Sequence, residues 1–275
     1  MSTRTEVLRE LEQMRPVGLA EMNQMASLQH RVDVKYLIEL PVLAAVLQTL
    51  TSSHRRLVID ETSSFHYRTV YFDTLDLQCF RAHKQGSRHR FKVRTRYYQD
   101  AHRYQFEVKR KDGRGATIKH ALPAEAEDFA EIQPPGNEFL NGVLHAAAVP
   151  PPSDPLIAAL LVRHQRSTLM STGGDARITI DTELGFSAPE APEQQVSSAR
   201  LREGWALVET KSAQGRSVAD TALRAVGARP TSISKYCLGT CLIRPDLPDQ
   251  PWTSLLRRHF TPAALPGPRT DEVRS

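Results

Sequence analysis

The side chains best suited to chemistry in this sequence are lysines and arginines that recur at every second position. Cationic and packing residues alternate over 90–97, where the even positions hold Arg90, Lys92, Arg94 and Arg96 and the odd positions hold Phe91, Val93, Thr95 and Tyr97. A period of two indicates a β-strand with one cationic face and one packing face. Guanidinium and ammonium groups bind multiply charged phosphates, so this face predicts a phosphate site.

Two glutamates lie within the same kind of pattern. Glu107 falls in FEVK and Glu209 in VETK, each two residues before a lysine, Lys109 or Lys211. Each glutamate therefore shares a strand face with its lysine. A carboxylate among many cations either pairs with them, which lowers their repulsion, or ligates a divalent metal that bridges phosphate. The ion pair is the commoner role for a single glutamate, and both roles stay open at this point.

Positive charge is concentrated around these residues. The segment 81–120 contains thirteen basic and three acidic side chains, a net charge of +10, which leaves −5 on the other 235 residues and +5 on the whole chain. Like charges on one strand face repel each other, and a fold tolerates them more readily when an anion is the intended neighbour.

The elements that must position these side chains are mostly strands with charged residues on one face. We expect strands at 31–40, 65–73, 88–98, 103–111, 116–122, 156–169, 176–184 and 205–211. Helices are expected before Pro16, after Pro41, over much of 124–148, where prolines interrupt the pattern, and at 217–227. Turns or loops are expected at 112–115, 150–155 and 187–200.

Such strands have two possible arrangements. The charged faces of an antiparallel sheet point to water in many proteins, with the apolar faces covering a core. Alternatively, the sheet closes into a barrel whose bore is lined by the charges and whose outside is covered by helices. A solvated face normally mixes lysine with glutamate, and the uniform sign of Arg90, Lys92, Arg94 and Arg96 favours the barrel.

Other classes of protein are excluded by what the sequence lacks. The longest mostly apolar stretch, 41–50, is far shorter than the roughly 20 residues of a membrane-spanning helix. The first ten residues contain no apolar run, so we expect no secretory signal. Three cysteines without a CxxC pair indicate a reducing, cytoplasmic setting and no structural zinc. No P-loop, dinucleotide-binding or HExxH motif is present.

Nine short motifs in a fixed order resemble a known family, the VTC domain of the triphosphate tunnel metalloenzymes, which is related to the CYTH proteins. They are RVDVKY (31–36), VYFDT (70–74), RHRFKVRTRYY (88–98), FEVKRK (106–111), Lys119, RxxR (163–166), RITIDT (177–182), VETK (208–211) and SKY (234–236). The resemblance implies an α+β fold, an eight-stranded antiparallel β-barrel (the triphosphate tunnel) with flanking helices. We expect an N-terminal helical and polar extension at 1–30, the tunnel domain at 31–245 and a mostly disordered tail at 246–275.

The resemblance also implies roles for individual residues. Lys35, Arg94, Arg96 and Glu209 are the expected catalytic residues, with Glu209 and Glu107 as candidate ligands of Mn²⁺ or Mg²⁺. The expected phosphate-binding residues are Lys92, Lys109, Lys119, Arg163, Arg166, Arg177, Lys211 and Lys235. Arg163 and Arg166 are alternatives, because the tyrosine that the family has before this arginine is His164 here. Asp33 stands where the family usually has glutamate.

Three functions fit these expectations. The first is a metal-dependent polyphosphate polymerase that transfers the γ-phosphoryl group of ATP to a growing polyphosphate chain. The second is a tunnel triphosphatase that hydrolyses tripolyphosphate or a nucleoside triphosphate. The third is a non-catalytic module that binds polyphosphate, inositol phosphates or RNA, although an RNA surface has little reason to keep the acids of FEVK and VETK. Eukaryotic relatives work beside a membrane channel, so we expect membrane association only through another protein.

Overall fold

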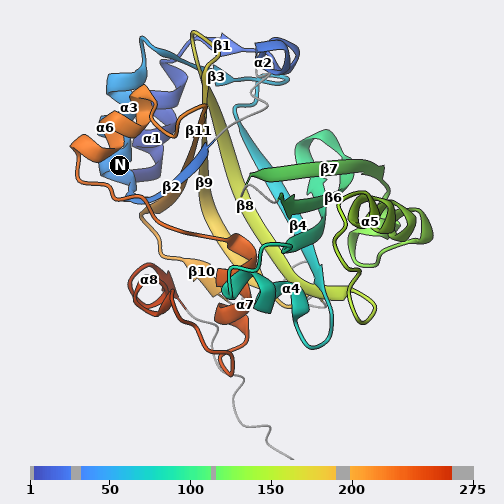
Figure 1. The fold of residues 1–275 in the computed structure, drawn as a ribbon. Coiled ribbons are helices and arrows are strands. Elements are labelled where there is room, and N and C mark those ends of the chain that lie inside the picture. Colours follow the sequence, from blue (N-terminus) through green and yellow to red (C-terminus); the bar gives the residue numbers. More distant parts are fainter. Residues whose placement is uncertain (1–2, 26–31, 113–115, 190–198, 262–275) are drawn as a thin grey trace, which may run out of the picture.

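The structure, a computed structural model, describes residues 3–25, 32–112, 116–189 and 199–261. Its centre is an antiparallel sheet of eight long strands in the order β2, β11, β9, β8, β4, β5, β6, β7 (Figure 1). Their bounds are β2 Val32–Glu39, β4 Ser64–Asp73, β5 Phe91–Tyr98, β6 Arg103–Lys111, β7 Thr117–Ala124, β8 Ile157–Ser171, β9 Ala176–Ser187 and β11 Trp205–Ser212. Four short strands extend this sheet: β1 Pro16–Val17, β3 His54–Leu57, β10 Ala199–Leu201 and β12 Phe260–Thr261.

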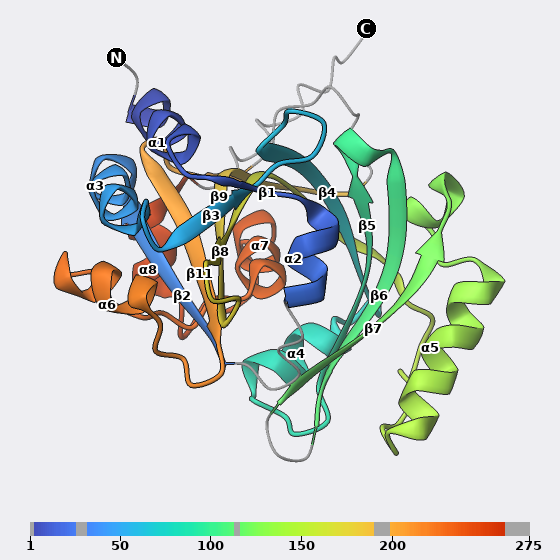
Figure 2. The ribbon, with the colours of Figure 1, turned by 90° about the horizontal axis from the view of Figure 1, so that it is seen from above.

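The sheet is strongly curved but open. Seen end-on, it bends into a trough with β2 and β7 on the two sides of its opening (Figure 2). Among the described strands, β2 pairs only with β11 and β7 only with β6, so no ladder of hydrogen bonds closes the barrel. The predicted α+β fold of eight antiparallel strands with flanking helices is confirmed, with an open edge where a closed barrel was expected.

Helices cover the convex side of the sheet. On one side α1 (Thr3–Glu12), α3 (Leu40–Leu50) and α6 (Val218–Ala225) pack on the outer faces of β2, β9 and β11 (Figure 2). The outward side chains there are apolar and buried, among them Tyr36, Ile38, Ile178, Ile180 and Val208. These are the positions that alternate with the charged residues, so the packing face predicted from the period of two is the face that meets the helices.

Helix α5 (Pro134–Ala146) covers the outside of β6 and β7. We expected the prolines near residue 134 to interrupt a helix, whereas they begin one, because proline is tolerated in a first turn where its missing N–H has no partner. Ser217 caps α6, and its hydroxyl accepts from the backbone N–H of Asp220 at 3.2 Å. The helix expected at 217–227 is therefore confirmed.

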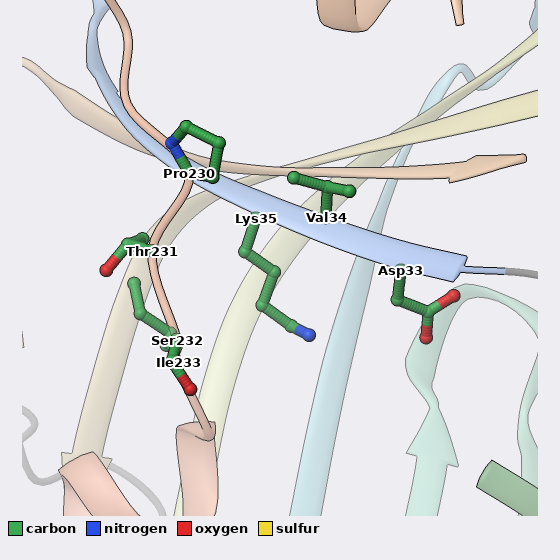
Figure 3. A pocket seen from close by; sticks show the side chains of 7 residues that line it. All are labelled: Asp33, Val34, Lys35, Pro230, Thr231, Ser232 and Ile233. Carbon is green, nitrogen blue, oxygen red and sulfur yellow. The ribbon is translucent and has the colours of Figure 1, made fainter. Parts of the chain in front are cut away.

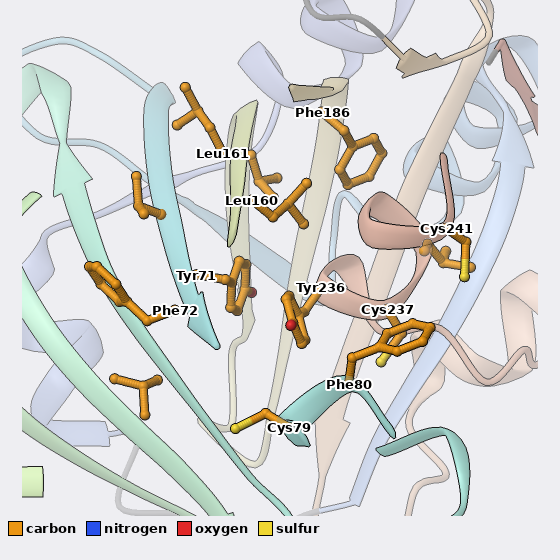
Figure 4. Close-up of a cluster of buried hydrophobic side chains, with 14 of the residues drawn as sticks. Tyr71, Phe72, Cys79, Phe80, Leu160, Leu161, Phe186, Tyr236, Cys237 and Cys241 are labelled. Carbon is orange, nitrogen blue, oxygen red and sulfur yellow. The ribbon is translucent and has the colours of Figure 1, made fainter. Parts of the chain in front are cut away.

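Helix α7 (Lys235–Ile243) lies inside the curve of the sheet and fills one end of it (Figures 1 and 2). Its Tyr236 ring stacks on Tyr71 of β4, with ring centroids 5.1 Å apart, in an apolar cluster drawn in Figure 4. Gly239 has to be glycine, because a Cβ atom there would lie 2.4 Å from the ring of Phe186 and 2.6 Å from Leu160. This close packing places the first turn of α7, with Lys235, at the remaining hollow of the sheet.

Asp73, at the end of β4, anchors both helices at this end of the sheet. Its carboxylate accepts from the backbone N–H groups of Cys79 at 2.8 Å and Phe80 at 2.9 Å in α4 (Gln78–Lys84), and from the hydroxyl of Tyr236. Cys79, Cys237 and Cys241 are all free and buried. None of the helices in the described part of the chain combines the length and apolar character needed to cross a bilayer.

The N-terminal extension contains the expected helix before Pro16, and the C-terminal segment contains more regular structure than expected. At the N-terminal end α1 is followed by β1 and α2 (Leu19–Met25), and β1 pairs with β3. Within the segment 246–275, expected to be mostly disordered, α8 (Thr253–His259) is followed directly by β12 (Phe260–Thr261). The structure differs from the expectation here because Trp252, Leu256 and Phe260 are buried, at positions four residues apart in a polar stretch. Arg31, most of the 112–115 turn, most of the 187–200 loop and everything after 261 lie outside the described residues.

Candidate functional site

The concave face of the sheet beside α7, called the bore below, collects charged residues from both walls. Strand register shows which side chains share this face, because directly opposed residues of antiparallel strands point the same way. On one wall, Lys35 of β2 opposes Glu209 of β11, and Lys211 of β11 opposes both Asp33 of β2 and Arg177 of β9. The predicted catalytic pair Lys35 and Glu209 is therefore adjacent, although 174 positions separate these residues in the sequence.

The facing wall carries the cationic block predicted from the sequence. Arg94 of β5 opposes Glu107 of β6, and Lys92 opposes Lys109, which in turn opposes Lys119 of β7. The start of α7 connects the two walls, because Lys92 of β5 donates to the hydroxyl of Ser234 at 3.1 Å and the next residue, Lys235, pairs with Asp181 of β9. The bore is thus one site rather than two separate strand faces.

Glu107 is the counter-ion of Arg94 on strand β5. Only 1% of its side chain is exposed, and its Oε2 accepts from Nε of Arg94 at 2.6 Å while Oε1 accepts from Lys119 at 3.2 Å. The Nη1 atom of Arg94 donates to the hydroxyl of Tyr71 at 3.0 Å. Burial alone would raise the pKa of Glu107, but Arg94 and the neighbouring cations hold it well below its ordinary value. Glu107 is therefore a charged ion-pair partner.

Asp181 of β9 forms a second buried cluster, and the sequence reasoning did not select it. Its carboxylate accepts from Nε of Arg166 at 2.6 Å and from Nη2 at 2.8 Å, and it also pairs with Lys235 at the start of α7. Asp181 is completely buried. Its pKa lies well below its ordinary value, since Arg166 and Lys235 outweigh the effect of burial. Asp181 shares the odd positions of RITIDT with Arg177, and this shared parity was the signal that could have identified it.

Glu209 belongs to a third cluster, which β11 and the edge strand β2 form together. It pairs with Lys211, whose ammonium group also lies 3.1 Å from Oδ2 of Asp33. The Glu209 side chain is 13% exposed, and although partial burial alone would raise its pKa, Lys211, Lys35 and Lys235 hold that pKa well below its ordinary value. Lys211 therefore joins two carboxylates that come from neighbouring strands.

Four bore cations have no carboxylate within ion-pair distance among the described residues: Lys35, Lys92, Arg96 and Lys109. Lys92 donates to the hydroxyl of Ser234 at 3.1 Å, and the guanidinium of Arg96 lies over the rings of Tyr67 and Tyr98, at 5.4 and 5.9 Å from their centroids. Arg96 is only 8% exposed. A buried cation such as Arg96, and partly buried lysines beside it, are stabilised by a bound anion.

The lysine pKa values reflect this excess of positive charge. The pKa of Lys109 is lowered well below its ordinary value, first by Arg94 and then by burial. Burial is the main cause that lowers the pKa values of Lys92 and Lys235, and the nearby cations Lys35 and Arg166 lower them further. Because an arriving anion would reverse these effects, the bore has the electrostatics of an anion site.

Arg163 does not join the bore. The β4 register places Arg163 opposite Arg68 and His164 opposite Tyr67, so Arg163 and Arg166 lie on opposite faces of β8. Arg163 donates to the hydroxyl of Ser187 at 3.3 Å on the outer side. The residues of β8 that face the bore here are Arg166 and the buried His164. The ring of His164 stacks on Tyr67, with ring centroids 5.2 Å apart.

The residues expected to ligate a metal lie in two different clusters. Glu107 is on β6 and Glu209 on β11, and no group of three or more His, Cys, Asp or Glu side chains in the described residues is arranged to hold a metal ion. Mg²⁺ is usually held by one or two carboxylates together with substrate phosphates. The donor set of Glu209 and nearby Asp33 fits an ion that arrives with phosphate oxygens rather than a resident, fully protein-bound metal.

Comparisons with solved structures return proteins of low sequence identity. A candidate adenylate cyclase from Bacillus halodurans is 12% identical, with a TM-score of 0.47 over 74% of this chain and 94% of that one. A candidate adenylyl cyclase from Hippeastrum, described as having a dominant triphosphatase activity, is 13% identical, with a TM-score of 0.44 over 80% and 99% of the two chains. A Pyrococcus horikoshii protein is 8% identical, with a TM-score of 0.41 over 75% and 98%.

No curated protein sequence matches the chain. A family model does: the VTC domain matches residues 30–244, from just before β2 to just after α7. This range contains every strand that lines the bore and every residue of the three ion-pair clusters. Because the match spans most of the 275 residues, the chain belongs to the VTC domain family.

Proposed function

We propose that this protein is a polyphosphate polymerase that transfers the γ-phosphoryl group of ATP to inorganic polyphosphate within the bore and releases ADP. Membership of the VTC domain family supports an enzyme that acts on polyphosphate or triphosphate. The observation that carries the proposal is the surplus of cations over carboxylates in the bore. Among the described residues, the cations on its face include Lys35, Lys92, Arg94, Arg96, Lys109, Lys119, Arg166, Arg177, Lys211 and Lys235, whereas the acids on that face are Asp33, Glu107, Asp181 and Glu209.

A phosphate chain matches this arrangement because its negative charges repeat along its length. Phosphoryl transfer needs little from a protein beyond alignment and neutralisation of charge. In the proposal Lys35, Arg94 and Arg96 hold the reacting phosphoryl group. The other cations hold the rest of the triphosphate and the growing chain, and Glu107 and Asp181 keep Arg94 and Arg166 in fixed orientations.

The state of the carboxylates supports transfer to phosphate over transfer to water. Glu107, Asp181 and Glu209 are all paired with cations, and their pKa values lie below the ordinary range, so none is a ready proton acceptor at neutral pH. A water nucleophile benefits from a base, whereas the terminal oxygen of a polyphosphate chain is already anionic. The bore therefore suits an acceptor that arrives deprotonated.

Mn²⁺ or Mg²⁺ is part of the proposal, with Glu209 as the principal protein ligand and Glu107 as the second candidate. When bound, such an ion would offset charge on the phosphate oxygens and the leaving group. The protein's own contribution is the wall of Lys35, Lys211 and Lys235 around Glu209, which holds the phosphate oxygens next to that carboxylate. We further propose a cytoplasmic location, with any membrane association through another protein.

The test is incubation of the purified protein with ATP and Mn²⁺, followed by electrophoresis for long-chain polyphosphate and assays for ADP and orthophosphate. Polymer with ADP in matching amounts is the expected result. Orthophosphate release without polymer would replace the polymerase with a triphosphatase. Tight binding of polyphosphate or RNA without turnover of ATP or tripolyphosphate would identify a binding module instead.

A further inference from the structure

A pocket of about 340 Å³ lies at the open edge of the sheet, beside the bore (Figure 3). Its lining comes from β2 and from the loop that joins α6 to α7: Asp33, Val34, Lys35, Pro230, Thr231, Ser232 and Ile233. The backbone N–H of Thr231 donates to the carbonyl of Lys35 at 2.8 Å, so this loop runs along the edge of β2 that faces away from β11. The pocket thus lies where the sheet fails to close.

The pocket is lined by charged side chains from β2 and by uncharged side chains from the loop. Lys35 and Asp33 extend from one side of β2, and Lys35 is a bore residue opposite Glu209 (Figure 3). The loop residues carry no charge: Pro230 and Ile233 are apolar, and Thr231 and Ser232 offer hydroxyl groups. A matching ligand has a polyanionic end that passes Lys35 into the bore and an uncharged end with flat apolar surface and hydroxyl groups.

We propose that this pocket is a nucleoside subsite, which holds the base and ribose of a nucleoside triphosphate whose phosphates enter the bore past Lys35. The inference rests on the proposed function, since it assigns the nucleotide end of that substrate. The volume lies at the lower end of the range for small-molecule sites, which suits a nucleoside. The hydroxyls of Thr231 and Ser232 can pair with ribose hydroxyls, and Pro230 and Ile233 cover the base.

The composition of the lining also predicts the specificity of the subsite. Its seven residues include no aromatic ring and no side-chain amide, the groups that would stack on one base or read its edge. We therefore expect ATP and GTP to bind with similar affinity.

The test compares ATP with tripolyphosphate, which has the phosphates but no nucleoside. Ser232→Phe fills the pocket from an exposed position, and Thr231→Val removes one hydroxyl without changing the side-chain shape. Ala225→Phe, at the exposed last residue of α6 and outside the pocket lining, is the matched control. Dissociation constants for both ligands are measured by titration calorimetry with Mg²⁺ present, and circular dichroism checks folding.

The expected result is a selective loss of nucleotide affinity. Ser232→Phe should weaken ATP binding about tenfold or more, Thr231→Val about two- to tenfold, and Ala225→Phe neither ligand. Tripolyphosphate affinity should stay within about twofold of the parent in all three variants. Thr231→Val keeps the question answerable if the larger side chain prevents folding.

Two other outcomes would overturn the subsite. Equal loss of ATP and tripolyphosphate would mean that the loop supports the bore rather than a nucleoside, and unchanged ATP binding in both pocket variants would mean that the nucleoside lies elsewhere. Both outcomes leave the proposed phosphate chemistry intact. A parent protein that binds neither ligand would refute the proposed function itself.

Discussion

The buried cluster around Asp181 offers the sharpest test of the electrostatics of the bore. Asp181→Asn keeps the shape of the side chain but removes the negative charge shared by Arg166, which donates at 2.6 and 2.8 Å, and Lys235. Because Asp181 is completely buried, water cannot replace that charge. Removing one partner of a buried ion pair costs about 3–5 kcal/mol. At about 2–4 °C per kcal/mol for a chain of this size, the Tm should fall by about 6–20 °C.

An anionic ligand should restore much of the loss, because it supplies negative charge to the same cations. Saturating tripolyphosphate should therefore raise the Tm of Asp181→Asn by more than it raises the Tm of the parent. Differential scanning fluorimetry at matched ligand concentrations measures both shifts. Asp175→Asn is the control, since Asp175 is exposed in the β8–β9 turn and accepts one hydrogen bond from Ser171 at 2.6 Å, worth about 1 kcal/mol or less.

Two results would refute this reasoning. A Tm of Asp181→Asn no lower than that of Asp175→Asn would show that the cluster does not depend on its counter-ion. An equal ligand-induced shift in Asp181→Asn and the parent would show that phosphate does not approach Arg166 and Lys235.

Three further predictions concern other charges of the bore. Lys109→Gln should raise the Tm of the ligand-free protein and weaken tripolyphosphate binding, because the pKa of Lys109 is lowered chiefly by repulsion from Arg94; a lower Tm would contradict this. Glu209→Gln should reduce polymer synthesis about 10²-fold while tripolyphosphate still binds, and full activity would exclude Glu209 from the site. Glu107 has a pKa below the value of 4.5 for a free glutamate, so its contribution to stability is present above that pH and lost as the pH falls through its folded-state pKa. The free energies of unfolding in urea of the parent and Glu107→Gln should therefore become equal only in strong acid. Equal values at pH 6 would contradict the assignment.

Much of the architecture follows from local patterns in the sequence. The alternation over 90–97 predicts strand β5 and its two faces, because strand geometry alone sends successive side chains to opposite sides. The same reasoning works for β6, β9 and β11, and the cap at Ser217 predicts the start of α6. The structure differs from the expectation at the open edge of the sheet, at Pro134, where a helix begins, and at 253–261, where α8 and β12 form. Local composition does not report which apolar side chains a distant surface will bury.

The roles of individual residues were harder to predict from the sequence than the strands and helices. The sequence left Arg163 and Arg166 as alternatives, because His164 stands where the family has a tyrosine, and nothing local marks which face of the strand is inward. Register against β4 separates them, and the pairing of Arg166 with Asp181 accounts for the inward position. Asp181 was missed for a related reason: an acid in a strand acquires meaning only when its neighbours on other elements are known.

The sequence by itself determined that a strongly cationic strand with one packing face exists and that its positive charge exceeds that of its surroundings. These are properties of residue order and of backbone geometry, which act over a few positions. Only the tertiary structure decided most of the ion pairs, since Glu107 and Asp181 are paired with cations on other strands and on α7. It also decided that the sheet stays open beside Lys35, because an edge depends on how strands far apart in the chain curve toward each other.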